Sequence, residues 1–314
     1  MMLRQIRNRL FSLLIILFGL SLLTFGLTFL LPSGPVEQVV AKMGITPDPE
    51  LIAQLKHEYG FDLPFPVQYA NWLKGIFRGD FGYSVINNDS VNAVLARRLP
   101  NTFRLAVTSF VLMILISFPL GILSALYKNR TADYIIRYLS FIGVSIPNFW
   151  FGMMLIWVFA VRLQLLPVSG SIGWKSLIMP SLTLGVTNSA YYIRRIRSVM
   201  VEQLSEDYIS GLRSRGVSDR RIVVRHVLPN SLLAVVTMLG MSFGGMLGGT
   251  MIVETVFSWN GIGKAAMEAV TGRDYALVQG YVLWMGCIYV LVNLLVDIIN
   301  QLLDPRIRRA SVER

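Results

Sequence analysis

The sequence is poor in the residues that build metal sites and disulfides, with one cysteine and two histidines in 314 residues. Cys287 lies inside an apolar run, so this chain alone can form neither a disulfide framework nor a thiolate metal cluster. A zinc protease or a haem protein needs more ligands than His57 and His226 provide. We therefore expect no catalytic residues, no metal site and no cofactor in this chain.

Charged residues are also scarce. They make up 15% of the chain against 54% hydrophobic residues, and the mean hydropathy is +0.57, whereas about a quarter of a soluble domain is charged. The net charge is +11, but the Lys and Arg residues stand between long apolar runs rather than on a basic, aromatic-rich soluble surface. This pattern argues against nucleic acid and favours membrane lipid as a partner.

Long apolar runs are what the sequence has in abundance. A helix needs about twenty apolar residues to cross about 30 Å of hydrocarbon, and six stretches meet or approach this length. They are Leu10–Leu31, Leu105–Tyr127, Ile135–Val161, Ile178–Ile193, Leu232–Val253 and Val278–Ile299. Pro147 predicts a kink in the third stretch. The first stretch is too long for a signal-peptide core and lacks a good cleavage site after it, so we favour a retained helix.

The distribution of Lys and Arg between these stretches predicts the orientation. Most of them fall on one side if the N-terminus is cytoplasmic, so we expect a multi-pass protein of the cytoplasmic (inner) cell membrane with both termini in the cytoplasm. We predict an all-α polytopic fold with six transmembrane helices. Its parts are an N-terminal transmembrane helix (1–31), an extracellular or periplasmic cap segment (32–102), a core domain with five transmembrane helices (103–303) and a cytoplasmic tail (304–314).

The segment 194–231 is too polar to span a membrane and too short to form a domain. We expect Arg194–Tyr208 to continue the preceding helix, with its arginines facing anionic lipid headgroups. Ile209–Gly216 predicts a short helix stopped by glycine, and Ser218 predicts the N-cap of a second helix that runs to Leu228-Pro229. Two short helices joined at a fixed glycine form a basic knob that suits docking into a cytoplasmic partner.

The same segment carries a family resemblance. Gly216 followed by Leu228-Pro229 matches the cytoplasmic-loop signature of ABC importer permeases. Glu206-Asp207-Tyr208-Ile209 resembles the version found in the branch that imports peptides and nickel. Ser210-Gly211-Leu212 and His226 depart from the general family pattern, and these departures are typical of that branch.

Further motifs extend the resemblance over almost the whole chain. In order they are Tyr59-Gly-Phe-Asp, Gly79-Asp80-Phe81-Gly82, Ser145-Ile-Pro-Asn-Phe-Trp150, Leu166-Pro167-Val-Ser-Gly170, Glu254-Thr-Val-Phe257-Ser-Trp259, Arg273-Asp274-Tyr275 and Asp304-Pro305-Arg306. One departure is Asn260, where the family usually has proline. The chain thus resembles the first, B-type permease subunit of a dipeptide, oligopeptide or nickel importer.

The resemblance implies a type I ABC importer permease fold in a transport subunit that is not itself an enzyme. It implies pairing with a second homologous permease subunit, with two cytoplasmic ATP-binding subunits and with an extracellular or periplasmic solute-binding protein. The residues that it assigns to coupling with the ATP-binding subunits are Glu206, Asp207, Tyr208, Ser210, Gly211, Leu212, Arg213, Gly216, Leu228 and Pro229. Independently, the sequence has no phosphate-binding loop, because Gly261-Ile-Gly-Lys264 lacks the upstream glycine and the hydroxyl residue that such a loop needs.

Two acidic residues fall at or within predicted spans, where a charge costs about 2.5–3.5 kcal/mol on insertion. For Glu254 we expect a bond to the backbone of the turn Ser258–Gly263 and a gating role, with contact to a cationic cargo as the alternative. For Asp297 we favour a hydrogen bond to Asn293, Asn300 or another helix over contact with cargo. The candidate gate and translocation path comprise Glu254, Trp259, Gly261 and Asp297.

Peptide and nickel permeases share these motifs, so weaker features indicate the cargo. The loop Pro167–Trp174 lacks the insertion common in dipeptide permeases, and Asp304–Arg309 resembles the nickel type. We expect nickel or a metal–chelate complex, with dipeptides or oligopeptides as the alternative. An intramembrane enzyme or a channel is the interpretation from another class. The sequence offers no paired nucleophile and base for an intramembrane enzyme, and a channel would leave the basic knob unexplained.

Overall fold

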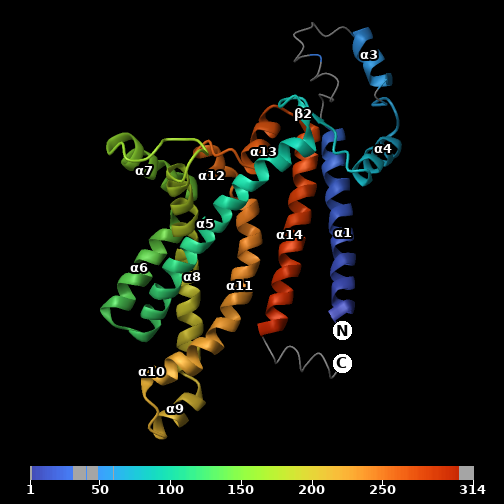
Figure 1. The fold of residues 1–314 in the computed structure, drawn as a ribbon. Helices are drawn as coiled ribbons and strands as arrows, with labels where there is room; N and C mark the ends of the chain where they lie inside the picture. The colour runs from blue at the N-terminus through green and yellow to red at the C-terminus, as the bar shows by residue number, and fades with distance from the viewer. Residues whose placement is uncertain (1, 31–39, 41–48, 59, 304–314) are drawn as a thin grey trace. The chain divides into compact units, whose positions relative to one another are not determined.

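The computed structural model describes residues 2–30, 40, 49–58 and 60–303 (Figure 1). Most of them are helical, as the apolar runs predict. The described strands are β1 (Tyr83–Ser84) and β2 (Asp89–Ser90), which pair antiparallel with Tyr83 opposite Ser90. The chain divides into two compact units. Unit 1 comprises Met1–Asn101 and Asn260–Val290, and unit 2 comprises Thr102–Trp259 and Leu291–Arg314.

Unit 1 holds the first apolar helix and the start of two others. Its elements are α1 (Met2–Phe29), α3 (Pro49–Glu58), α4 (Phe65–Phe77), β1, β2, α13 (Ile262–Thr271) and the N-terminal parts of α5 (Val91–Leu126) and α14 (Tyr275–Leu303). Its core forms where α5, α13 and α14 meet, because Val91, Leu95, Ile262 and Leu277 are buried together there.

Aromatic rings join α4 to α1. The ring of Phe25 lies with its centroid 5.3–5.5 Å from those of Phe65, Tyr69 and Trp72. The hydroxyls of Ser21 and Tyr69 share a hydrogen bond of 2.8 Å. Such aromatic pairs contribute about 0.5–1.5 kcal/mol each beyond the area that they bury. The aromatic run of the predicted outer segment therefore packs on the first apolar helix.

Asp274 connects the strand pair to the start of α14. Its carboxylate is buried and accepts hydrogen bonds from the Ser84 hydroxyl (2.6 Å), the Ile86 N–H (3.1 Å) and the Leu277 N–H (3.1 Å). The last is an N-cap bond, because Asp274 directly precedes the first residue of α14. This residue of the Arg273-Asp274-Tyr275 motif therefore has a structural role.

We expect Asp274→Ala to destabilise unit 1 by about 1–3 kcal/mol, because three donors, two of them buried, lose their acceptor. The measurement is the melting temperature of the purified protein in detergent. Asp89→Ala is the matched control, since Asp89 belongs to β2 of the same unit but pairs with Arg97 at the surface, where ion pairs contribute little. Equal melting temperatures for the two variants would contradict the capping role of Asp274.

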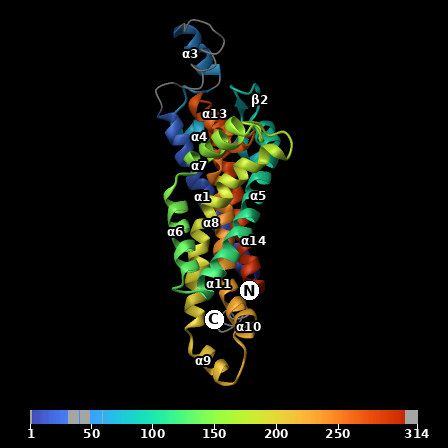
Figure 2. The same cartoon turned by 90° about the vertical axis from the view of Figure 1, so that its left-hand side faces the viewer.

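Unit 2 holds the remaining helices. They are α6 (Thr131–Ser145), α7 (Asn148–Leu155), the π-helix η1 (Ile156–Arg162), α8 (Lys175–Leu204), α9 (Asp207–Ser214), α10 (Asp219–Ile222), the π-helix η2 (Val223–Val227), α11 (Leu228–Gly249), α12 (Met251–Val256) and the rest of α5 and α14. Figures 1 and 2 show α8 and α11 running side by side, with α9 and α10 at their common end.

Two glycines allow α5 and α8 to approach closely. A Cβ at Gly185 in α8 would lie 2.9 Å from the Cβ of Leu112, and a Cβ at Gly121 in α5 would lie 2.8 Å from the Cβ of Ile196. Both distances are shorter than side-chain contacts in folded proteins allow. Alanine at either position would push the two helices apart, so the glycines set their separation.

Three described helices are long and apolar enough to cross a membrane: Phe11–Phe29 in α1, Val91–Leu126 (α5) and Tyr275–Val296 in α14. The pair Thr131–Ser145 and Asn148–Arg162 gives a fourth if the two form one span. α8 and α11 stand where the fourth and fifth spans are expected, but neither qualifies by length and composition in the described residues. The number six therefore stays a prediction, as does the outer cap.

The third predicted span is broken rather than kinked. α6 ends at Ser145 and α7 begins at Asn148, and the two are bent by 100°. Ile146 and Pro147 both have extended backbone, with ψ of 124° and 136°. The residue before a proline is sterically kept out of the helical region, so the helix stops one residue earlier and starts again after the proline.

Candidate functional site

The predicted knob is present and consists of α9, α10 and η2. α9 begins at Asp207, after Glu206 in an extended conformation. The expectation that the preceding helix continues to Tyr208 is wrong, because α8 ends at Leu204. Asp207 lies in the first turn of α9, where a negative charge is favoured by the helix dipole. The acidic pair thus marks the start of a new helix, not the end of the old one.

Gly216 stops α9 as predicted. Its φ is +77°, a left-handed conformation that favours glycine. The N–H of Val217 donates to the carbonyl of Leu212 (3.1 Å), and the N–H of Gly216 donates to that of Arg213 (2.9 Å). These two bonds form a Schellman motif, which satisfies the last carbonyls of the helix. Gly216 therefore fixes the direction in which the chain leaves α9.

Most of the proposed coupling residues lie at the surface of this element. Glu206, Asp207, Tyr208, Ser210, Gly211, Arg213, Gly216 and Pro229 are exposed, while Leu212 and Leu228 are half-buried against the core of unit 2. Ile209 and Ile222 are fully buried and fix the two helices to that core. Arg213 Nε lies 3.0 Å from Asp219 Oδ1 and joins α9 to α10. The knob thus presents a polar face on an apolar anchor.

The second helix of the knob differs from the prediction at both ends. Ser218 occupies the N-cap position, but its side chain makes no capping hydrogen bond. The helix does not end at Leu228-Pro229, because α10, η2 and α11 follow one another without a break. Pro229 lacks an N–H and lies in the first turn of α11, directly after the π-helical turn η2. Wider π turns accommodate such an interruption, so the knob is continuous with α11.

Glu254 of α12 is completely buried within unit 2. Its Oε1 accepts hydrogen bonds from the Thr102 hydroxyl (2.7 Å) and the Thr250 hydroxyl (3.0 Å). Its backbone carbonyl accepts from the N–H of Trp259 (2.7 Å), and Trp259 is itself buried. Among these bonds, the one to the turn that follows α12 is made by the backbone carbonyl of Glu254. The carboxyl group instead connects α5 to α12.

The other candidates for the gate lie elsewhere in the chain. Gly261 belongs to unit 1, where it occupies the N-cap position of α13. The backbone carbonyl of Asn260 accepts a hydrogen bond of 2.8 Å from the Asn101 side chain, also in unit 1. The side chain of Asp297 lies outside the described part of the chain. The path role of these residues stays a prediction.

A buried ion pair is the main polar feature that the sequence does not reveal. Asp133 of α6 has no exposed surface, and its two oxygens lie 2.6 and 2.7 Å from Nε and Nη2 of Arg197 in α8. Ser124 Oγ (2.6 Å) and the Asn129 N–H (2.9 Å) also donate to the carboxylate. The expectation that Arg197 faces lipid headgroups is therefore wrong. The guanidinium of Arg197 instead pairs with the buried carboxylate of Asp133, which accepts four hydrogen bonds in all.

Comparison with known proteins gives a consistent result. The chain matches the family described as binding-protein-dependent transport system inner membrane component over residues 117–309, and its N-terminal companion family over residues 2–106. The glutathione transport system permease proteins GsiC of Salmonella typhimurium (strain LT2) and Escherichia coli (strain K12) are each 36% identical to it over 307 residues. The alignments cover 98% of this chain and 99% of each relative.

Two solved structures share the fold. Chains of the inward-facing MetNI methionine ABC transporter and of an amino acid ABC transporter have TM-scores of 0.56 and 0.51, at 19% and 17% sequence identity. The first alignment covers 67% of this chain and 96% of the other, and the second covers 68% and 94%. At this identity the likeness concerns the fold alone, which is that of a type I ABC importer permease.

These findings confirm the resemblance. The relatives are components of membrane transport and not enzymes, and their family implies ATP-binding subunits and a partner permease. The chain belongs to the family of inner membrane components of binding-protein-dependent transport systems, as a multi-pass permease subunit of an ABC importer.

Proposed function

We propose that this permease carries a short peptide of the glutathione type across the membrane. The similarity to glutathione permeases over the full length of both chains carries this proposal. The expectation of nickel or a metal chelate finds no support among these relatives. It depends on a short loop and on a tail, and the tail, residues 304–314, lies outside the described residues.

Uptake assays in a strain that lacks this transporter test the cargo. The complete transporter is restored on a plasmid, and labelled glutathione, a labelled dipeptide and radioactive nickel are supplied in parallel. We expect uptake of glutathione or the dipeptide that disappears when an ATP-binding subunit loses its phosphate-binding lysine. Accumulation of nickel alone would overturn the choice of a peptide.

We propose further that α9 and α10 dock on the ATP-binding subunits. The argument is mechanical. Ile209 and Ile222 anchor the knob in the same core as α8, and α10 continues through η2 into α11, so a force applied to the exposed face reaches two long helices. The exposed arginines Arg213, Arg215, Arg220, Arg221 and Arg225 would steer an acidic partner surface toward it.

Gly216→Val is expected to reduce uptake about tenfold, whereas Gly216→Asn retains more activity. A Cβ at this position meets no atom within 4 Å, so the effect comes from backbone strain at φ +77°, which costs about 1–2 kcal/mol for ordinary residues and less for asparagine. Uptake and ATP hydrolysis in proteoliposomes are the measurements. Normal uptake by Gly216→Val would refute a need for this turn. Equal losses in both variants would indicate close contact with the partner instead.

Docking of α9 and α10 on cytoplasmic ATP-binding subunits also determines how we propose the chain to be oriented in the membrane. The knob end is cytoplasmic, both termini are cytoplasmic, residues 32–102 lie outside and meet a solute-binding protein, and residues 103–303 form the translocating core. Single cysteines at Ser218 and Asn71, introduced after removal of Cys287, test it with a membrane-impermeant thiol reagent. Asn71 is expected to react in intact cells and Ser218 only after lysis. The reverse pattern would overturn the orientation.

A further inference from the structure

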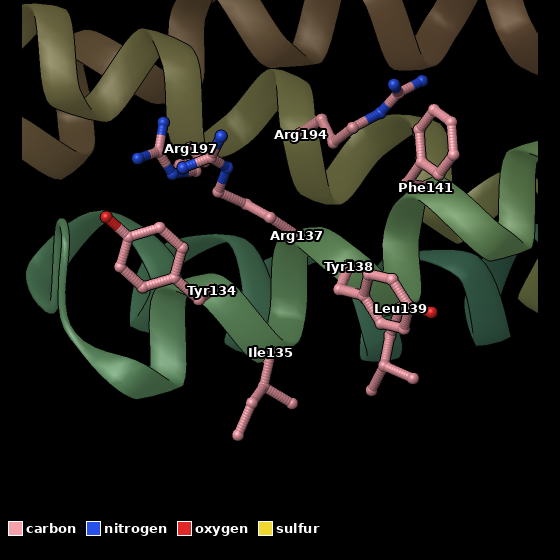
Figure 3. Close-up of a pocket in the computed structure, with 8 residues that line it drawn as sticks. All are labelled: Tyr134, Ile135, Arg137, Tyr138, Leu139, Phe141, Arg194 and Arg197. Atoms are coloured by element: carbon pink, nitrogen blue, oxygen red, sulfur yellow. The ribbon is translucent and has the colours of Figure 1, made fainter.

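An open groove lies between α6 and α8 of unit 2 (Figure 3). It has a volume of about 780 Å³. α6 contributes Tyr134, Arg137 and Tyr138, and α8 contributes Arg194 and Arg197. Figure 3 shows the side chain of Arg137 extending from α6 toward α8, from which Arg194 and Arg197 project. Three guanidinium groups therefore border one groove.

The charges of these groups are not balanced. Arg197 is neutralised by the buried carboxylate of Asp133. Arg137 and Arg194 have no acidic group within ion-pair distance among the described residues, and the guanidinium of Arg137 lies over the ring of Tyr134 at 5.7 Å. Two positive charges are thus left to attract an anion, and each has hydrogen-bond donors free to meet it.

The rest of the groove is apolar and aromatic. Ile135, Leu139 and Phe141 are each more than half exposed, and Tyr138 is 68% exposed. Figure 3 shows Ile135 and Leu139 pointing away from α8. Arg194 directly follows the apolar stretch 178–193 of α8. Tyrosines and arginines beside exposed aliphatic side chains are typical of the boundary between hydrocarbon and headgroups.

We propose that this groove binds the headgroup of an anionic phospholipid. The phosphate would lie between the guanidinium groups of Arg137 and Arg194, and the acyl chains would cover Ile135 and Leu139. A dissolved anion satisfies the charges but leaves the aliphatic side chains uncovered, whereas a zwitterionic lipid covers them but brings no net charge. Basic pockets between transmembrane helices are known to select anionic headgroups in this way.

Lipid binding to the purified, assembled transporter tests the proposal. The complex, with its partner permease and ATP-binding subunits, is delipidated in detergent and titrated with phosphatidylglycerol or phosphatidylcholine, and bound lipid is counted by native mass spectrometry. We expect preferential binding of phosphatidylglycerol. The double variant Arg137→Gln/Arg194→Gln should weaken it about tenfold to thirtyfold, because each basic residue contributes about one factor of five.

Arg195→Gln is the matched control, since it removes the same charge from the neighbouring position of α8, outside the groove. It should leave binding unchanged, and the melting temperature should show that all variants are folded. Equal binding of the two lipids would overturn the proposal, as would an equal loss in the control. Displacement of the lipid by millimolar inorganic phosphate would indicate a site for small anions. Absence of lipid in the assembled complex would mean that a partner subunit covers the groove. Either of these results also overturns it.

Discussion

Asp133→Ala is expected to destabilise unit 2 by about 3–5 kcal/mol, the largest effect on stability that the structure predicts. The substitution leaves the Arg197 guanidinium, with a side chain only 19% exposed, facing a cavity without its counter-ion. It also removes the acceptor of Ser124 Oγ and of the Asn129 N–H. For a unit of this size the melting temperature should fall on the order of 10 °C. Thermal unfolding of the detergent-solubilised transporter is the measurement.

Two further variants separate the ion pair from a general intolerance to substitution. Asp133→Leu/Arg197→Leu should recover much of the loss, because an apolar pair of similar volume avoids the cost of a buried, unpaired charge. Asp219→Ala removes an exposed carboxylate that also pairs with an arginine, and it should have little effect. If the double variant is no more stable than Asp133→Ala, the charge of Arg197 is not the cause of the damage.

The sequence predicts the helices of this protein better than their polar contacts. Hydropathy locates α1, α5 and α14, because an apolar run of sufficient length is a local property. Gly216 and Pro147 are also read correctly as interruptions, since each restricts its own backbone or that of its neighbour. The degree of interruption at Pro147 is not predicted. A break, rather than a kink, needs both Ile146 and Pro147 to be extended.

Pairs of residues that lie far apart in the sequence cannot be predicted from such local properties. Asp133 and Arg197 are 64 positions apart, and each has other charged residues near it in the chain. Hydropathy places both at the ends of apolar stretches, which equally suits contact with headgroups. Only the packing of α6 on α8 decides that one arginine turns to a buried carboxylate while Arg194 does not.

Glu254 shows the same limit in the candidate site. Its buried position follows from the cost of a charge in an apolar run. Thr250, four positions earlier, lies on the same helical face and could be predicted as a partner. Thr102 could not, because it is 152 positions away and belongs to another helix. The sequence thus identifies which residue needs partners but not all the partners that it finds.

Glu254→Ala is expected to reduce uptake about tenfold, with Glu254→Gln intermediate. The alanine variant leaves the buried hydroxyls of Thr102 and Thr250 without this acceptor, which costs about 1–3 kcal/mol. Glutamine keeps one acceptor oxygen but replaces the other carboxyl oxygen with an amide nitrogen, so it preserves only part of the surroundings of the carboxyl group. Because the carbonyl of Glu254 also holds the N–H of Trp259, we expect loosening at Glu254 to reach the turn that follows. Uptake of labelled cargo, corrected for the amount of transporter in the membrane, is the measurement.

A double-mutant cycle tests whether the bond to Thr102 carries this effect. Thr102→Val removes the donor, and Thr102→Ser preserves it and serves as the control. If the hydrogen bond is responsible, Thr102→Val/Glu254→Gln should be little worse than Thr102→Val alone, because Glu254→Gln can only weaken a bond that Thr102→Val has already removed. Additive losses would place the effect of Glu254 elsewhere in its surroundings. Unchanged uptake by Glu254→Gln would contradict a gating role, since replacing a carboxyl group that controls opening of the path changes the equilibrium between closed and open states.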